Sequence, residues 1–105
     1  MKVVWQEPAR EGRRQVAVYI RKEFGTKRAK IFRQAVDDTV QLLMRSPYIG
    51  KVDPLFESHA TTYRSIIING LNKLVYHIDG DTIYIVDFWD TRREPANAST
   101  ATDKE

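Results

Sequence analysis

The spacing of apolar residues changes once along this chain, and that change limits the folds it can adopt. Up to Leu43, apolar residues recur every three or four positions, which is the period of an amphipathic helix. From Thr62 onward, short runs rich in Ile, Val, Tyr and Thr are separated by turn residues, which is typical of β-strands. We therefore expect an α+β domain in which the helices precede most of the strands.

Two helices are predicted in the first half of the chain. The first runs from about Pro8 to Phe24, because proline suits the first turn of a helix. Gly25 is placed to end it in the left-handed conformation, and Thr26 to cap the next helix. The second helix should stop at Ser46-Pro47, because the residue before proline avoids the α region. Two helices with so short a joint form an antiparallel hairpin.

One strand is expected before the helices and three after them. These strands are Lys2–Trp5, Thr62–Asn69, Lys73–Ile78 and Thr82–Phe88, and the segment after Gly50, to about Thr61, is interpreted as a loop. Asp79-Gly80 between two apolar runs is a strong hairpin signal, typical of a type I′ turn. The last three strands are therefore predicted to form an antiparallel meander.

The predicted elements fit one two-layer domain. The helix hairpin should cover one face of the sheet, and the other face should be free and carry the function. With 105 residues there is no room for a second substrate-binding domain, so we place a single domain at residues 1–95. Residues 96–105 contain Ala, Ser, Thr and charged residues without a large apolar side chain, and are predicted to be a disordered tail.

The composition excludes several classes of function. The chain has no Cys, which removes disulfide scaffolds, thiol nucleophiles and cysteine-based zinc sites. It contains no phosphate-binding glycine loop and no metal-site motif, and we expect His59 and His77 to be polar residues rather than ligands. No apolar run approaches a membrane span. We therefore expect a soluble, cytoplasmic protein without cofactor, metal or membrane partner.

The charge of the chain is unevenly distributed. The net charge of +3 combines ten basic and three acidic residues up to Ala35, a balance of +7, with seven basic and eleven acidic residues beyond it, a balance of −4. A concentrated positive field favours an anionic partner, either a nucleic acid or an acidic protein segment. The alternative is that these residues only form the solvated faces of two helices.

Several cations and rings fall on the predicted meander. Arg64 and Lys73 begin two of its strands and Arg92-Arg93 follow the last, so all converge on one end or face of the sheet if the register allows. Arginine suits phosphate because its guanidinium donates two parallel hydrogen bonds. The rings on which a base could stack are Tyr63, Tyr76, Tyr84 and Trp89. In the alternative interpretation, Tyr76 and Tyr84 are core residues, and Arg92 and Arg93 pair with Asp87, Asp90 and Glu94.

The order and spacing of several short segments carry a family resemblance. In the second half these segments are Tyr63-Arg64-Ser65, Lys73-Leu74-Val75-Tyr76, Ile83-Tyr84-Ile85-Val86 and Trp89-Asp90-Thr91-Arg92-Arg93-Glu94-Pro95. In the first half they are Val4-Trp5, Tyr19-Ile20, Phe24-Gly25, Ala29, Phe32 and the stretch from Leu43 to Gly50. Over about residues 2–95 the chain resembles the RelE/ParE superfamily of bacterial type II toxins.

This resemblance implies a small toxin encoded beside an antitoxin. The antitoxin neutralises such a toxin by laying a helix and an extended segment across its surface. RelE-like members enter the ribosomal A site and cleave mRNA, whereas ParE-like members act on DNA gyrase and trap its cleavage complexes without being nucleases. The partners implied are therefore a cognate antitoxin, in a toxin–antitoxin hetero-oligomer, and either gyrase or the ribosome with its mRNA.

Only part of the RelE-like active site has a match in this chain. Arg64 matches a basic position of that site, and Arg92 or Arg93 matches the arginine after the last strand. RelE-like toxins also use a Tyr or His near the C-terminus, and neither follows Trp89 here. His77 and Glu94 are weaker substitutes for the missing acid or base. The departure favours the ParE-like branch; the alternatives are a RelE-like endoribonuclease and a non-toxic protein that binds an antitoxin.

The basic first helix is the expected docking surface. Arg13, Arg14 and Arg21, with Trp89, are the residues predicted to bind the antitoxin or the target. Complementary potentials speed association and fix register, so the antitoxin is expected to be acidic.

Overall fold

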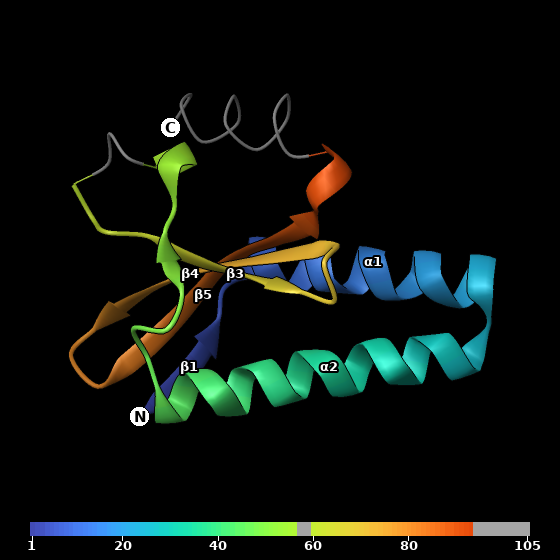
Figure 1. Cartoon of the computed structure of the whole chain (residues 1–105), viewed down its shortest axis with the longest axis horizontal. Coiled ribbons are helices and arrows are strands. Elements are labelled where there is room, and N and C mark those ends of the chain that lie inside the picture. Colours follow the sequence, from blue (N-terminus) through green and yellow to red (C-terminus); the bar gives the residue numbers. More distant parts are fainter. Residues whose placement is uncertain (57–59, 94–105) are drawn as a thin grey trace.

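In the computed structural model, which describes residues 1–56 and 60–93, the chain folds into two α-helices and a five-stranded sheet (Figure 1). The two helices lie side by side as an antiparallel hairpin on one face of the sheet. The elements in chain order are β1 (Lys2–Trp5), α1 (Glu7–Phe24), α2 (Thr26–Arg45), β2 (Lys51–Val52), a short 3-10 helix (Pro54–Phe56), β3 (Arg64–Ile68), β4 (Asn72–Asp79), β5 (Thr82–Asp90) and a second 3-10 helix (Thr91–Arg93).

The sheet is mixed, with the strand order β1-β5-β4-β3-β2. Strands β3, β4 and β5 form the predicted antiparallel meander, and β1 pairs with β5 in the parallel direction. The expected α+β fold is therefore confirmed. The segment predicted as a loop contains one further strand, β2, which pairs with β3 through only two residues. A strand that short has no alternation by which a sequence could reveal it.

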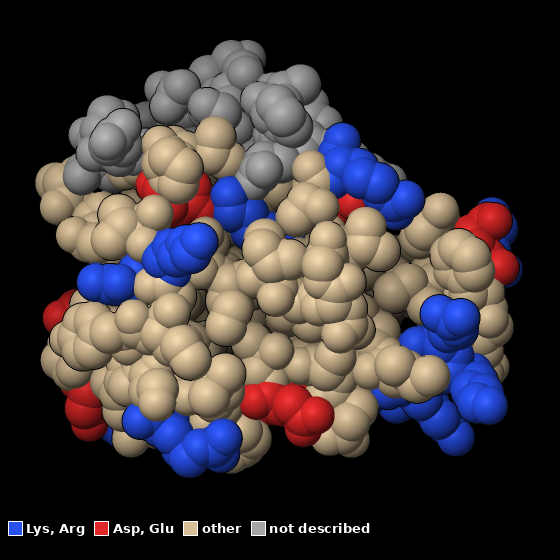
Figure 2. Space-filling view, viewed as in Figure 1, with Lys and Arg blue, Asp and Glu red and all other residues tan. Residues whose placement is uncertain are grey.

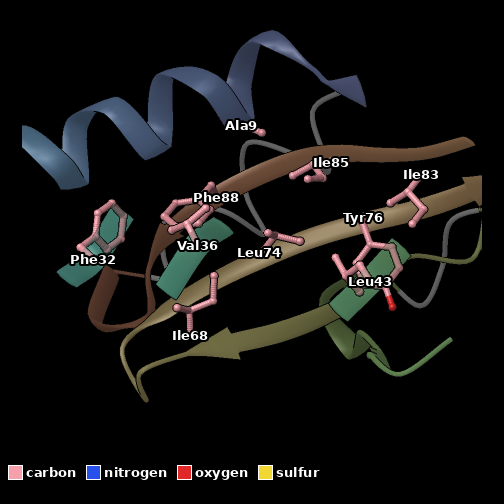
Figure 3. Close-up of a cluster of buried hydrophobic side chains, with 10 residues drawn as sticks. All are labelled: Ala9, Phe32, Val36, Leu43, Ile68, Leu74, Tyr76, Ile83, Ile85 and Phe88. Carbon is pink, nitrogen blue, oxygen red and sulfur yellow. The ribbon is translucent and has the colours of Figure 1, made fainter. Parts of the chain in front are cut away.

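The hydrophobic core fills the space between the hairpin and the sheet (Figure 3). Alternate residues of β4 and β5 point toward the helices, and α2 supplies most of the opposing side chains. Its members are Ala9, Phe32, Val36, Leu43, Ile68, Leu74, Tyr76, Ile83, Ile85 and Phe88. Tyr76 is thus a core residue, as the alternative interpretation of the strand aromatics held, whereas Tyr84, which that interpretation also placed in the core, is half-buried outside it.

A bulge in β5 sets which of its residues face the core. The partners of two consecutive β4 residues are Ile85 and Asp87, so Val86 has no partner in the ladder. One extra residue reverses the alternation of side chains beyond it. Ile85 and Phe88, three positions apart, are therefore both buried under the helices.

The structure corrects the predicted turn chemistry at two glycines. Gly25 has φ 93° and ψ 172°, a region open essentially to glycine but not the left-handed helical one, and it caps α2 itself in place of Thr26. In the β4–β5 hairpin only Gly80 has a positive φ, 63°. A single positive φ at the first turn residue is the pattern of a type II′ turn, whereas the predicted type I′ turn needs two.

The helix layer approaches the sheet closely at Gly12 of α1. A Cβ built on this residue would lie 1.9 Å from the carbonyl oxygen of Phe88 in β5. No side chain fits in that gap, so the helix backbone packs directly on the strand.

We predict that Gly12→Ala destabilises the protein although alanine is the better helix former. Alanine gains up to about 1 kcal/mol of helix propensity. Moving α1 away from Phe88 costs about 2 to 3 kcal/mol in strained packing, so the free energy of unfolding falls. Urea denaturation measures the difference, with Glu23→Ala on the exposed side of α1 as the control. A Gly12→Ala protein as stable as the parent would contradict this account of the interface.

The Tyr76 hydroxyl holds the loop between α2 and β2. It donates a hydrogen bond to the Pro47 carbonyl at 2.7 Å and accepts one from the Gly50 N–H at 3.0 Å. Burial raises the pKa of Tyr76, which keeps the hydroxyl protonated and able to donate. A single buried side chain thereby connects the end of α2 to the centre of the sheet.

We expect Tyr76→Phe to lower the free energy of unfolding by about 1 to 3 kcal/mol, because it leaves the Pro47 carbonyl and the buried Gly50 N–H without their partner. Tyr84→Phe is the matched control, since its hydroxyl makes no hydrogen bond within the described part of the chain. Thermal and urea unfolding of both variants test this. Equal stability of the two variants would show that the hydroxyl does not hold the loop.

Candidate functional site

The face of the sheet away from the helices is partly covered, contrary to the expectation that it is free. The side chains of Lys73, Val75 and His77 alternate with the core residues of β4 and therefore lie on this second face. Asp53, just before the 3-10 helix, is buried there, and its Oδ2 lies 2.8 Å from the Lys73 Nζ. Phe56, at the end of that helix, is also buried.

Aromatic rings continue across this second face. Tyr63 contacts Phe56 and His77 with ring centroids 5.1 and 5.5 Å apart, and His77 stacks on Tyr84 at 5.2 Å. At the other end of the face, the Lys73 Nζ lies 5.6 Å from the centre of the Trp89 ring. Tyr63, Tyr84 and Trp89 thus share one half-buried surface, whereas Tyr76 points into the core.

Arg64 is on the other side of the sheet from this surface. It pairs with Tyr76 in the β3–β4 ladder, so its side chain lies on the helix side. There it donates a 2.9 Å hydrogen bond to the Gly50 carbonyl and lies over the ring of Tyr48, 5.2 Å from its centroid. Arg64 therefore supports the loop that Tyr76 also holds.

Arg92 is paired with a carboxylate of its own segment. Its Nε lies 3.0 Å from the Asp90 Oδ1, and this interaction, with a smaller contribution from the Tyr19 hydroxyl of α1, raises the pKa of Arg92. The alternative interpretation, in which this arginine pairs with Asp90, is confirmed. Only the backbone of Arg93 is described, and Glu94 lies outside the described residues.

The register keeps the predicted phosphate-binding cations apart. Arg64 stands opposite Tyr76, whereas Asp90, beside Arg92, stands opposite Asn72. The two β4 positions are four residues apart, which is about 13 Å along the strand. Lys73 is at the Arg92 end of β4 but on the second face. Arg64 therefore forms a cluster of cations with neither Lys73 nor Arg92.

The arginines of α1 differ in how far they are engaged. Arg13 lies over the Trp5 ring and 3.4 Å from the Asp37 Oδ1, which connects α1, α2 and β1. Arg14 pairs with Glu11 one turn earlier, and this pair lowers the pKa of Glu11. Arg21 is exposed near the end of the hairpin and makes no ion pair within residues 1–56 and 60–93.

Two features escaped the sequence analysis. The buried Asp53–Lys73 pair joins a loop residue to a strand residue with no local signal. The second feature is a group of exposed apolar side chains near the end of the hairpin, Phe24, Ile31 and Leu71. Ile31 carried a usable signal, because it is a large apolar residue beside rather than on the apolar face of α2.

Among the described residues, no group of three or more His, Cys, Asp or Glu is placed to hold a metal ion. Neither described helix is long and apolar enough to cross a membrane. His59 lies outside the described residues.

Comparison with known structures shows the same fold in two bacterial proteins. A chain of the chromosomal ParDE toxin–antitoxin system from P. aeruginosa matches with a TM-score of 0.68 and 16% identity, over 86% of this chain and 95% of that one. The YoeB/ParE toxin from Agrobacterium tumefaciens matches with a TM-score of 0.58 and 20% identity, over 86% of this chain and 98% of that one. No curated protein matches by sequence.

A protein-family model gives the assignment. The model described as "ParE toxin of type II toxin-antitoxin system, parDE" matches residues 3–95, which cover the described helices and strands apart from Lys2, the first residue of β1. The chain therefore belongs to the ParE toxin family of type II toxin–antitoxin systems.

Proposed function

We propose that this toxin inhibits DNA gyrase by binding it in the cytoplasm, and that a cognate antitoxin neutralises it. The observation that supports a binding inhibitor over a nuclease is the separation of Arg64 from Arg92. Cleavage of RNA through its 2′-hydroxyl needs cations close together on one phosphate, with an acid and a base beside them. Here the two arginines lie at opposite ends of the β3–β4 pairing, and each is bound to a protein acceptor.

The remaining candidate for proton transfer is also poorly placed for cleavage. His77 lies between the rings of Tyr63 and Tyr84 on the second face of the sheet, whereas Arg64 is on the helix side. A general base must reach the proton it removes within hydrogen-bond distance, directly or through one water. This arrangement supports the ParE-like branch that the missing C-terminal Tyr or His already favoured.

Because the chain belongs to the ParE toxin family, we infer that a cognate antitoxin is its partner. The positive charge of the helix hairpin supports an acidic one, since its field accelerates the approach of a negatively charged segment. In this proposal the helices carry the contact with the antitoxin.

The proposal predicts that purified toxin blocks DNA supercoiling by gyrase or leaves cleaved DNA in the reaction. The physical reason is occupation of the enzyme by a folded inhibitor, so the effect should saturate with toxin concentration. Gel assays of relaxed plasmid with gyrase measure it, with the toxin pre-incubated with its antitoxin as the control. Unchanged supercoiling at doses that arrest growth in cells would contradict the proposal.

The same proposal predicts that mRNA stays intact when the toxin is induced. Primer extension on translated transcripts before and after induction tests this directly. Cleavage within codons, lost in Arg64→Ala and Arg92→Ala while both variants remain folded, would establish the RelE-like alternative. Growth without arrest at full expression would indicate a non-toxic protein that only binds the antitoxin.

A further inference from the structure

The outer edge of β1 is a free edge of the sheet. In the strand order β1 lies at one end, and it pairs only with β5 among the described strands. The N–H groups of Lys2 and Gln6 donate to carbonyls of the turn before β5 and of β5 itself, at 2.8 and 2.9 Å. Because successive N–H groups of a strand point in opposite directions, those of Val3 and Trp5 point away from β5. The edge therefore presents backbone groups with which another strand could pair.

A groove runs between this edge and the first half of α1. We call it the β1-edge groove; it has a volume of about 620 Å³ and is open to solvent. Its lining contains three arginines and no carboxylate, so its field favours an anionic ligand. The walls are formed by Val3, Val4 and Trp5 of β1 and by Arg10, Arg13 and Arg14 of α1.

Two of these arginines are available to a bound segment. Arg10 is exposed and makes no ion pair in the part of the chain that the structure describes. The side chain of Arg14 is 64% exposed, and its pair with Glu11 lies on the solvent surface, where such a pair contributes little. Arg13 is held over the Trp5 ring. A ligand in the groove would therefore meet Arg10 and Arg14 first.

The groove is separate from the cations at the tip of the helix hairpin. It lies beside the first half of α1, whereas the basic residues from Arg21 to Arg33 flank the joint between α1 and α2. Figure 2 shows Lys and Arg side chains gathered at that end of the molecule, and Figure 1 shows β1 away from it. A partner held at the tip would leave the β1 edge open.

We propose that the β1 edge binds an extended, acidic segment of DNA gyrase, which adds a strand to the sheet beside β1. An extended segment can form main-chain hydrogen bonds with the outward groups of Val3 and Trp5. A helix has no such groups to offer, because it satisfies its own backbone hydrogen bonds. The choice of gyrase rests on the proposed function, in which gyrase is the target and the antitoxin contacts the helices.

The two faces of the sheet set the side-chain pattern of the bound segment. Side chains of a strand alternate between the faces. On the helix side they would enter the groove beside Arg10 and Arg14, where Asp or Glu is favoured. On the second face they would lie beside Val4, which pairs with Tyr84 in the ladder and is 41% exposed, so apolar residues are favoured there. The segment is therefore expected to alternate acidic and apolar residues.

The test measures the affinity of the full-length toxin for intact gyrase by calorimetry. Val3→Pro removes an N–H that points away from β5 and places the proline ring at the edge, so the pairing with β5 is kept. Affinity should fall about tenfold or more, because the hydrogen bond is lost and the ring obstructs the incoming strand. Circular dichroism and thermal unfolding establish that the variant is folded.

Two controls separate the edge from other effects of the substitution. Val52→Pro places the same ring on β2, the strand at the other edge of the sheet. The Asp53 N–H donates to the Tyr63 carbonyl, so the Val52 N–H, like that of Val3, points away from its partner strand. Val3→Thr keeps the N–H and the branched side chain. Both controls should bind gyrase as the parent does.

The charge of the groove is tested separately. Arg10→Glu should lower the affinity for gyrase about tenfold at low salt and much less at high salt, since exposed charges are screened. Lys51→Glu, on β2 and away from the groove, is the control.

Parental affinity in the folded Val3→Pro toxin would overturn the proposal while leaving gyrase as the target. A parent toxin without measurable affinity for gyrase would instead overturn the proposed function, and this assignment with it. Two further outcomes would give the edge another occupant. A loss of antitoxin affinity alone in Val3→Pro would assign it to the antitoxin, and a toxin dimer that Val3→Pro abolishes would assign it to a second copy of this chain.

Discussion

The direct packing of the α1 backbone on β5 at Gly12 is the contact on which the helix layer depends. With no side chain between them, the height of α1 above the sheet is set by main-chain atoms. The Phe88 ring then packs against Trp5 of β1 and Phe32 of α2, with ring centroids 6.2 and 6.0 Å away. The β5 bulge is what turns Phe88 toward these partners, so one extra residue in a strand and one missing side chain in a helix act together.

At the other end of the domain, polar side chains hold the loops against the sheet. Tyr76 and Arg64 both bind the loop from Pro47 to Gly50, which returns the chain from α2 to the sheet edge. On the second face, the buried Asp53–Lys73 pair holds the segment before the first 3-10 helix against β4. Arg64, Lys73 and Tyr76, which a polar reaction site could use, are therefore committed to holding loops. The cations without ion pairs in the described chain are concentrated on the helices instead.

The sequence predicted most of the fold, because hydrophobic period and the strongest turn signals are local properties. Both helices, β1 and the three-stranded meander follow from such signals, and the family resemblance followed from the order of short segments. The two-residue β2 had no period, and the type of turn at Gly80 depends on angles that Asp-Gly leaves open. The predicted grouping of Arg64 with Arg92 was wrong because it depended on register, and antiparallel pairing sends the beginning of β3 and the end of β5 to opposite ends of β4. Arg13 and Arg14 were identified as basic surface. The Glu11 partner of Arg14 is one turn earlier on the same helix, whereas the Asp37 partner of Arg13 belongs to α2 and is brought close only by the fold.

The positive charge and the aromatic rings lie on different layers of the protein. The cations between Arg21 and Arg33 belong to the helix hairpin, whereas Lys73, His77 and Trp89 lie on the second face of the sheet. A partner attracted by the field of the helices would therefore bind on the helix layer and would not cover the second face.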